Sequence, residues 1–266
     1  MILNPFEWMI ARRYLLPGRS EAFIALVAGI SVVVVMLSVA MLVIVMCVMN
    51  GFRGELLDRI VGLNGHAIIQ AYGGRLDNWQ DVLERTQATE GVVRASPLIE
   101  QPLLGTANGR VEGVVVRGNT AEDIAALSDK LVMGNLADIR ANDGTVAIGA
   151  RLAMNIGAGV GDTITIINPA GRSTPFGTVP RQIGYRVAAV FETGVYDFDK
   201  AFVIMPIPDA QTLLLTGDTI GMIEVVTVDA DKVEEILAPV SQSLAGQAEV
   251  NSWKRINASI FEALEV

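Results

Sequence analysis

The fold of this chain is decided by residues 22–52, AFIALVAGISVVVVMLSVAMLVIVMCVMNGF, which contain no charged side chain. A helix of about 31 residues is about 45 Å long, whereas about 20 residues cross the hydrocarbon core of a bilayer. A soluble protein would have to bury such a helix on every face, and the remainder of a 266-residue chain is too small to surround it. We therefore predict a transmembrane helix over residues 21–52.

Positive charge precedes this helix. Arg12, Arg13 and Arg19 lie within residues 1–20, which we interpret as an interfacial helix because aromatic and apolar side chains are interleaved with the arginines. The positive-inside rule then predicts a cytoplasmic N-terminus and an extracytoplasmic chain after the helix. A signal peptide would have an apolar core of about 7 to 15 residues followed by a small-residue cleavage site. The longer run favours an uncleaved anchor.

The composition excludes several classes of function. The formal net charge of −9, with no clustered basic stretch, excludes a nucleic-acid partner. Cys47 is the single cysteine and His66 the single histidine, which excludes a disulfide within the chain and a histidine-rich metal site. Asp197 and Asp199 are interpreted as turn residues rather than as paired catalytic carboxylates. We expect no catalytic residue, no metal site and no cofactor.

The helix is predicted to continue beyond the membrane. Residues 53–65 keep apolar side chains at helical spacing, with Phe52 and Leu56 on one face, and we interpret them as a stalk. A strand is expected over residues 67–70. His66 lies at the joint between the two elements and is interpreted as a structural group with satisfied hydrogen bonds.

Residues 66–252 are predicted to form one extracytoplasmic domain. Hydrophobic spacing predicts a helix over 76–89 and two separate strands over 92–98 and 101–106, and Asn108-Gly109 predicts a hairpin turn. Because hairpins need antiparallel neighbours, we predict an α+β fold of mixed or antiparallel strands with packed helices, rather than a doubly wound sheet. Further elements are expected at 145–149, 150–156, 162–167, 185–191, 223–228, 231–244 and 249–252.

Three glycines at positions 157, 159 and 161 have the spacing of part of a nucleotide-binding loop. They precede a predicted strand, whereas a dinucleotide fingerprint follows a strand and opens a helix. The sequence contains no Gly-Lys-Ser/Thr phosphate loop. We interpret the glycines as a helix-to-strand turn and expect no ATP hydrolysis by this chain.

The most informative loop is NPAGRSTPFGTVPRQ, residues 168–182, called the proline-rich segment below. Its three prolines, two glycines and lack of a strand pattern predict an ordered, exposed excursion between two strands, with Phe176 at the tip. By itself this pattern is equally consistent with a long solvated hairpin.

Four stretches carry a resemblance to a known family. They are the residues around Arg13, residues 48–69 (VMNGFRGELLDRIVGLNGHAII), residues 147–166 (AIGARLAMNIGAGVGDTITI) and residues 192–214 (ETGVYDFDKAFVIMPIPDAQTLL). Together they resemble the LolC/LolE family, the membrane subunits of lipoprotein-releasing ABC transporters, within the wider MacB and FtsX-like superfamily. The resemblance implies the inner membrane of a Gram-negative bacterium, with the main domain in the periplasm.

The resemblance also implies partners and sites. LolC-type subunits have, at the place of the proline-rich segment, a hook that captures the periplasmic lipoprotein chaperone. The implied chaperone-binding residues are Pro169, Thr174, Pro175, Phe176, Gly177, Val179, Pro180, Arg181 and Gln182. The implied lipoprotein and stalk residues are Val48, Met49, Phe52 and Leu56. The implied partners are a LolA-like chaperone, a LolD-like cytoplasmic ATPase, a second membrane subunit that is LolE-like or identical, outer-membrane lipoproteins and membrane lipid.

The pattern departs from the family at its C-terminal end. Family members continue through three further spans, whereas this sequence stops at Val266. We expect a subunit truncated before its second transmembrane helix, with residues 253–266 as the lead-in. Three alternatives stay open: a hybrid subunit that serves both LolC and LolE roles, a MacB/FtsX-like subunit for efflux or control of a cell-wall hydrolase, and a single-pass anchored scaffold.

Overall fold

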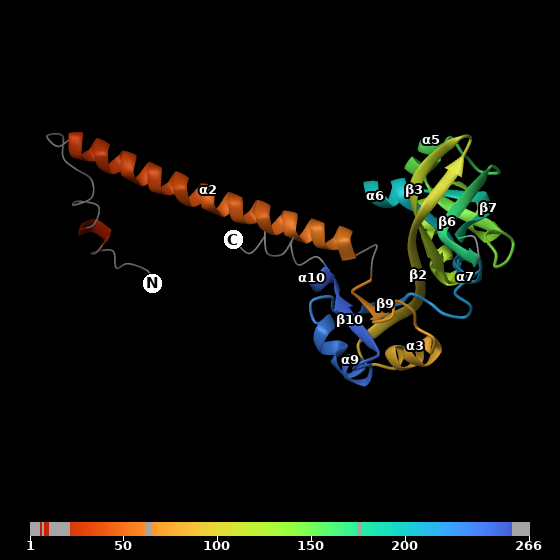
Figure 1. Ribbon diagram of the computed structural model, residues 1–266. Helices are drawn as coiled ribbons and strands as arrows, with labels where there is room; N and C mark the ends of the chain where they lie inside the picture. The colour runs from red at the N-terminus through yellow and green to blue at the C-terminus, as the bar shows by residue number, and fades with distance from the viewer. Residues whose placement is uncertain (1–5, 7, 11–21, 62–64, 175–176, 257–266) are drawn as a thin grey trace. The chain divides into compact units, whose positions relative to one another are not determined.

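The computed structural model describes residues 6, 8–10, 22–61, 65–174 and 177–256, and the chain divides into two compact units, residues 1–62 and residues 63–266 (Figure 1). Most of the predicted interfacial helix and most of the predicted lead-in lie outside the described residues. Each unit is described by itself below.

The first unit contains helix α2, Ala22–Val61. The predicted apolar helix is confirmed, and it continues to Val61, within the residues 53–65 that were predicted to form a stalk. Its part Leu26–Met49 has a mean hydropathy of 3.2 and is long and apolar enough to cross a membrane. The hydroxyls of Ser31 and Ser38 donate to the carbonyls four residues earlier, at 2.9 and 2.8 Å. These polar groups are therefore satisfied within the helix, as an apolar surrounding requires.

The second unit begins with a small antiparallel sheet, called the first lobe. Its strand order is β10 (Ala248–Ser252), β1 (Ala67–Ala71), β9 (Met222–Thr227) and the beginning of β2 (Val92–Ala107). Three short helices accompany it: α3 (Trp79–Gln87), α8 (Val233–Ile236) and α9 (Ala238–Ser243). The predicted helix over 231–244 is therefore wrong as one element. Pro239 lacks the N–H that a continuous helix would use at this position, and α9 starts afresh around it.

The remainder of the second unit is a closed barrel. Strand pairing runs from β2 to β3, β8, β5, β7 and β6 and returns to β2, which leaves no free edge in this ring. The strands and helices of this part are β3 (Arg110–Asn119), β4 (Leu131–Gly134), β5 (Thr145–Gly149), β6 (Thr163–Thr174), β7 (Gly177–Phe191), β8 (Phe202–Pro206), α4 (Ala121–Ala125), α5 (Ala150–Ile156), α6 (Tyr196–Ala201) and α7 (Ile207–Leu214), with the 3-10 turns Ala126–Lys130 and Leu136–Asp138. Two of the pairings, β3 with β8 and β5 with β7, are parallel. The predicted α+β class with mixed strands is thus confirmed.

Strand β2 joins the first lobe to the barrel (Figure 1). Its residues 92–98 pair with β9, and its residues 99–107 pair with β3. The prediction of two separate strands was wrong, because the strand runs without interruption through Pro97 and Pro102. The predicted hairpin is confirmed: Ala107 pairs with Arg110 across a two-residue turn in which both central residues have positive φ.

The joint before β1 is held by His66. Its Nδ1 lies 2.9 Å from the hydroxyl of Thr227 and accepts a hydrogen bond from the N–H of Thr227 at 3.1 Å. Burial lowers the pKa of the imidazole, and the nearby carboxylate of Asp229 opposes this shift. The histidine is therefore a satisfied structural group, as the sequence predicted, and its neutral form fits the folded state better.

Acidification is expected to destabilise the domain through His66. Because the folded-state pKa lies below the unfolded value of about 6.5, the unfolded chain binds more protons as the pH falls through that value, and the free energy of unfolding decreases. Urea unfolding at pH 7.5 and pH 5.5 measures this change. The decrease should be smaller in His66→Gln, and an equal decrease in both proteins would refute the assignment.

Candidate functional site

The proline-rich segment forms the outer part of a long hairpin between β6 and β7 (Figure 1). The two strands pair from Thr163–Arg186 to Asn168–Arg181, and the ladder then shifts. It resumes at Arg172–Val179 and ends at Thr174–Gly177. The prediction of a loop without strands was therefore wrong, and the alternative of a long hairpin is the observed structure.

The prolines explain why the sequence pattern misled. Pro169 and Pro180 lie in the irregular stretch between the Asn168–Arg181 and Arg172–Val179 pairs, where they have no ladder partner. Proline lacks a backbone N–H and is tolerated in a hairpin at such bulges. Pro175 and Phe176 lie outside the described residues.

Glycine and asparagine shape this bulge. A Cβ added at Gly171 would lie only 2.0 Å from the carbonyl oxygen of Val179, so the strands approach too closely here for any side chain. The buried amide of Asn168 accepts from the N–H of Ala170 at 3.0 Å and donates to the carbonyl of Leu213, in α7, at 3.3 Å. The base of the hairpin is thereby fixed to the barrel.

Most of the predicted chaperone-binding residues that the structure describes are exposed. They are Pro169, Gly177, Val179, Pro180 and Gln182, and Val179 is 57% exposed although it is apolar. Thr174 closes the ladder opposite Gly177, and its side chain is outside the described set. Beyond the bulge, the outer part of the hairpin pairs only with itself among the described strands. It presents an exposed surface of little charge.

Arg181 differs from these residues because it is half-buried. Its Nε is buried and has no hydrogen-bond partner within the described part of the chain. Its charge acts on Tyr185, whose hydroxyl donates to the carbonyl of Asp209 at 3.4 Å. The pKa of Tyr185 is raised to about 12 by burial and by the Asp209 carboxylate, and Arg181 opposes this shift. Part of the guanidinium is thus held against the barrel.

The predicted lipoprotein and stalk residues lie in the other unit, on α2. Val48 and Met49 are 63% and 45% exposed. Phe52 and Leu56 belong to the same helix, and their side chains are outside the described set.

Asp197 and Asp199, expected in a turn, lie in the first turn of α6. Asp199 is buried and accepts from the N–H and hydroxyl of Thr193 at 2.7 and 2.8 Å and from the N–H of Gly194 at 3.1 Å. Gly157 has φ 67° and ends α5, which confirms the helix-to-strand turn. Across the described ranges, no group of three or more His, Cys, Asp or Glu side chains is placed to hold a metal ion.

One buried network of hydrogen bonds, around Arg117 and Glu224, was not predicted from the sequence. Arg117 donates to Glu224 Oε1 at 2.9 Å, and the same oxygen accepts from the N–H of Gly65 at 2.9 Å. Both charged side chains are less than 10% exposed, and the Arg117 guanidinium lies 5.8 Å from the ring centre of Phe202. The signal was present as single charges inside two apolar strand patterns, VVVRG and MIEVV. This pair joins the barrel, the first lobe and the first described residue after α2.

The chain resembles known membrane and periplasmic proteins. Residues 28–243 match the sequence profile of the MacB-like periplasmic core domain. The lipoprotein-releasing system transmembrane protein LolC of Xylella fastidiosa is 26% identical over 268 residues, which cover 100% of this chain and 64% of that protein. The corresponding LolE of Haemophilus influenzae is 25% identical over 217 residues, covering 79% of this chain and 51% of that protein. The chain thus spans less than two thirds of the length of these relatives.

Among solved structures, the periplasmic region of MacB from Actinobacillus actinomycetemcomitans has a similar fold. It superimposes with a TM-score of 0.51 at 15% sequence identity, covering 77% of this chain and 97% of that one. At this identity the similarity concerns the fold alone.

Proposed function

We propose, from the premise that the chain belongs to the MacB-like periplasmic core domain family, that it acts as the membrane subunit of a lipoprotein-releasing ABC transporter of the LolC type. The similarity to LolC over the whole chain supports this proposal. The apolar helix and the folded domain after it agree with a subunit anchored in the inner membrane of a Gram-negative bacterium. By the positive-inside rule its N-terminus is cytoplasmic and its domain periplasmic.

In the proposed mechanism this chain binds and transmits rather than catalyses. A LolD-like ATPase in the cytoplasm hydrolyses ATP, because this sequence has no phosphate loop. Helix α2 transmits the motion together with a second, LolE-like or identical membrane subunit. Outer-membrane lipoproteins and membrane lipid contact the exit of the helix, near Val48, Met49, Phe52 and Leu56. A LolA-like chaperone docked on the proline-rich segment receives the lipoprotein.

The observation that carries the chaperone step is the extension of the β6–β7 hairpin beyond the barrel. The outer pairs are held only by their own ladder, while Asn168 anchors the base to α7. Exposed Val179 and the neighbouring Pro180 offer apolar contact, and half-buried Arg181 offers a positive charge for acidic groups of the chaperone. A projection that is anchored at its base and carries apolar and cationic groups suits a docking element.

A second candidate is a MacB/FtsX-like subunit that transmits motion to an efflux pump or a cell-wall hydrolase. The chain shares its fold with the MacB periplasmic region, and this fold is as compatible with the second candidate as with the first. The proline-rich hairpin separates the two, because the first proposal needs it as a docking site and the second gives it no role. The third alternative, a single-pass scaffold, would not need an ATPase partner.

Site-specific photo-crosslinking tests the docking proposal in cells. A photoreactive amino acid at Val179 is expected to form an adduct with the lipoprotein chaperone, because this exposed residue lies on the outer hairpin. Val111, 60% exposed at the other hairpin of the barrel, is the matched control and should give none. Equal adducts at the two positions, or none at Val179 alongside a functional transporter, would contradict the docking site.

A further inference from the structure

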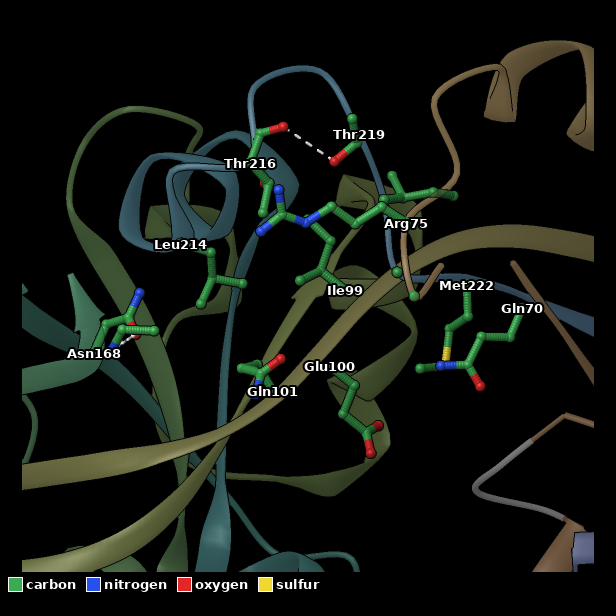
Figure 2. A pocket seen from close by; sticks show the side chains of 14 residues that line it. Gln70, Arg75, Ile99, Glu100, Gln101, Asn168, Leu214, Thr216, Thr219 and Met222 are labelled. Carbon is green, nitrogen blue, oxygen red and sulfur yellow. Dashed lines mark hydrogen bonds between the residues drawn. The ribbon is translucent and has the colours of Figure 1, made fainter. Parts of the chain in front are cut away.

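The sheet of the second unit contains a gap beside β2. Strand β9 pairs with β2 as far as Leu98, opposite Met222, and β6 joins only at Leu104, opposite Ile167. Between these points β2 has β3 on one side and, among the described residues, no strand on the other. A pocket of ≈ 340 Å³ fills the gap (Figure 2). This pocket, called the slot, is lined among others by Arg75, Glu100, Asn168, Thr216, Gly221 and Met222.

The main chain of β2 faces the slot with unpaired groups. Ala107 and Arg110 flank the two-residue turn and form a hydrogen-bonded pair, so alternate residues back to Ile99 also bond β3. The main-chain N–H and C=O groups of the intervening residues point to the opposite side of β2. At Leu104 and Thr106 that side is occupied by β6. At Glu100 that side is the slot, which therefore receives the N–H and C=O of Glu100.

Two neighbours of Glu100 agree with this orientation. A Cβ built on Gly221 would lie 3.9 Å from the Glu100 nitrogen, so a larger side chain here would lie against this N–H. Pro102, the next residue that points into the gap, has no N–H to leave unpaired, and proline occurs within sheets where no ladder bond is required.

The slot also contains a cation and a hydroxyl without partners. Arg75 forms no ion pair or hydrogen bond within the described ranges, and it extends across the pocket in the direction of Thr216 (Figure 2). The hydroxyl oxygen of Thr216 is buried and has no hydrogen-bond partner in the described structure. An unpartnered buried polar atom costs free energy that a ligand can recover.

The one carboxylate in the slot does not neutralise Arg75. Glu100 is the cross-strand partner of Arg117, and its Oε2 lies 4.0 Å from Arg117 Nε. In Figure 2 its side chain points away from Arg75. Arg75 is therefore available to an anion from outside the chain.

We propose that the slot binds a short extended peptide segment whose carboxylate, from a C-terminus or an acidic side chain, is held by Arg75. One peptide unit of the ligand pairs with the N–H and C=O of Glu100, as in strand addition to a sheet edge. A peptide unit supplies an N–H donor and a C=O acceptor at the spacing that the edge of a strand requires, which inorganic phosphate does not. The site goes beyond the chaperone-docking function and does not depend on it.

Binding of defined peptides to the purified chain in detergent tests the proposal. The probes are acetyl-Ala-Ala-Ala with a free carboxylate, the same peptide as its C-terminal amide, and acetyl-Ala-Asp-Ala amide. We expect the neutral amide to bind at least about tenfold more weakly than an acidic probe, because a charge-assisted hydrogen bond is lost. The stronger of the two acidic probes identifies the source of the carboxylate.

Two variants test separately the two parts of the slot, the Arg75 cation and the main-chain groups of Glu100. Arg75→Gln should weaken the acidic peptides at least about tenfold and leave the neutral one unchanged. Arg85→Gln is the matched control, since Arg85 is exposed, is paired with Asp81 at 2.8 Å and should not affect binding. Gly221→Val, which places a side chain over the Glu100 N–H, should abolish binding of every peptide. Thermal unfolding of each variant confirms that it is folded.

Three results would overturn the proposal. The first is equal binding of acidic peptides to the wild type and to Arg75→Gln. The second is competition by inorganic phosphate as effective as by the peptides, which would make the slot a general anion site. The third is no binding of either acidic peptide at millimolar concentration.

Discussion

Glu224→Ala is expected to lower the free energy of unfolding of the domain by about 3–5 kcal/mol, the usual cost of removing one partner of a buried ion pair. Arg117 would remain buried with only Glu100, whose Oε2 lies 4.0 Å from its Nε, as a counter-charge, and that Nε already lacks a hydrogen-bond partner among the described residues. The N–H of Gly65 would lose its acceptor at the same time. Two hydrogen bonds, from Arg117 and from the N–H of Gly65, meet on this one carboxylate.

Urea unfolding followed by near-ultraviolet circular dichroism measures this loss. Glu235→Ala, an exposed glutamate on α8, is the matched control and should change the free energy by less than about 0.5 kcal/mol. The double variant Arg117→Met with Glu224→Leu should recover part of the loss, because it removes both charges together. If Glu224→Ala unfolds at the wild-type urea concentration, the network does not stabilise the domain.

The features that the sequence predicted correctly depend on neighbouring residues. The apolar helix follows from an uncharged run, and the β2–β3 turn from Asn108-Gly109, whose positive φ values suit a two-residue hairpin. The short helix α5 and its stop at Gly157 follow from local spacing and from the conformational freedom of glycine. Each of these signals lies within a few residues of the structure it specifies.

The errors concern contacts between distant segments. The strands predicted over 92–98 and 101–106 are one strand, β2, which changes partners between them and needs no N–H at Pro102 on the side of the slot. The closure of the barrel depends on β6 returning to β2 and on two parallel pairings, for which the sequence carries no local signal. Register between remote strands is set by the whole core rather than by either strand.

The proline-rich segment was predicted as an excursion between two strands, with a long hairpin as the open alternative, and the described residues form that hairpin. Pro169, Gly171 and Pro180, three of the prolines and glycines that identified the segment, lie in its bulge. The half-buried state of Arg181 could not be inferred from sequence, because it depends on the packing of Tyr185 against α7. The Arg117–Glu224 pair was missed for the same reason, since its partners are remote in sequence.

The largest functional effect is expected from changing the proline-rich segment itself. Pro175→Ala, Phe176→Ala and Arg181→Gln together remove a proline, an aromatic side chain and a cationic group from the segment. Loss of a central aromatic anchor commonly costs 2 kcal/mol or more, so we expect the affinity for the lipoprotein chaperone to fall by about 100-fold. The barrel should stay folded, because the outer hairpin is anchored at Asn168 and contributes little to the core.

The matched control changes exposed apolar side chains elsewhere on the barrel. Val132 and Met133 on β4 are 53% and 59% exposed, and their replacement by serine removes a comparable apolar surface. This variant should bind the chaperone with the affinity of the wild type. A loss in both variants would indicate a broad apolar surface rather than the hairpin.

Calorimetric titration of the purified lipoprotein chaperone into the wild-type chain, the hairpin variant and the β4 variant tests the central claim most directly. We expect tight binding to the wild type and the β4 variant and about 100-fold weaker binding to the hairpin variant. Equal affinity for the wild type and the hairpin variant would contradict it.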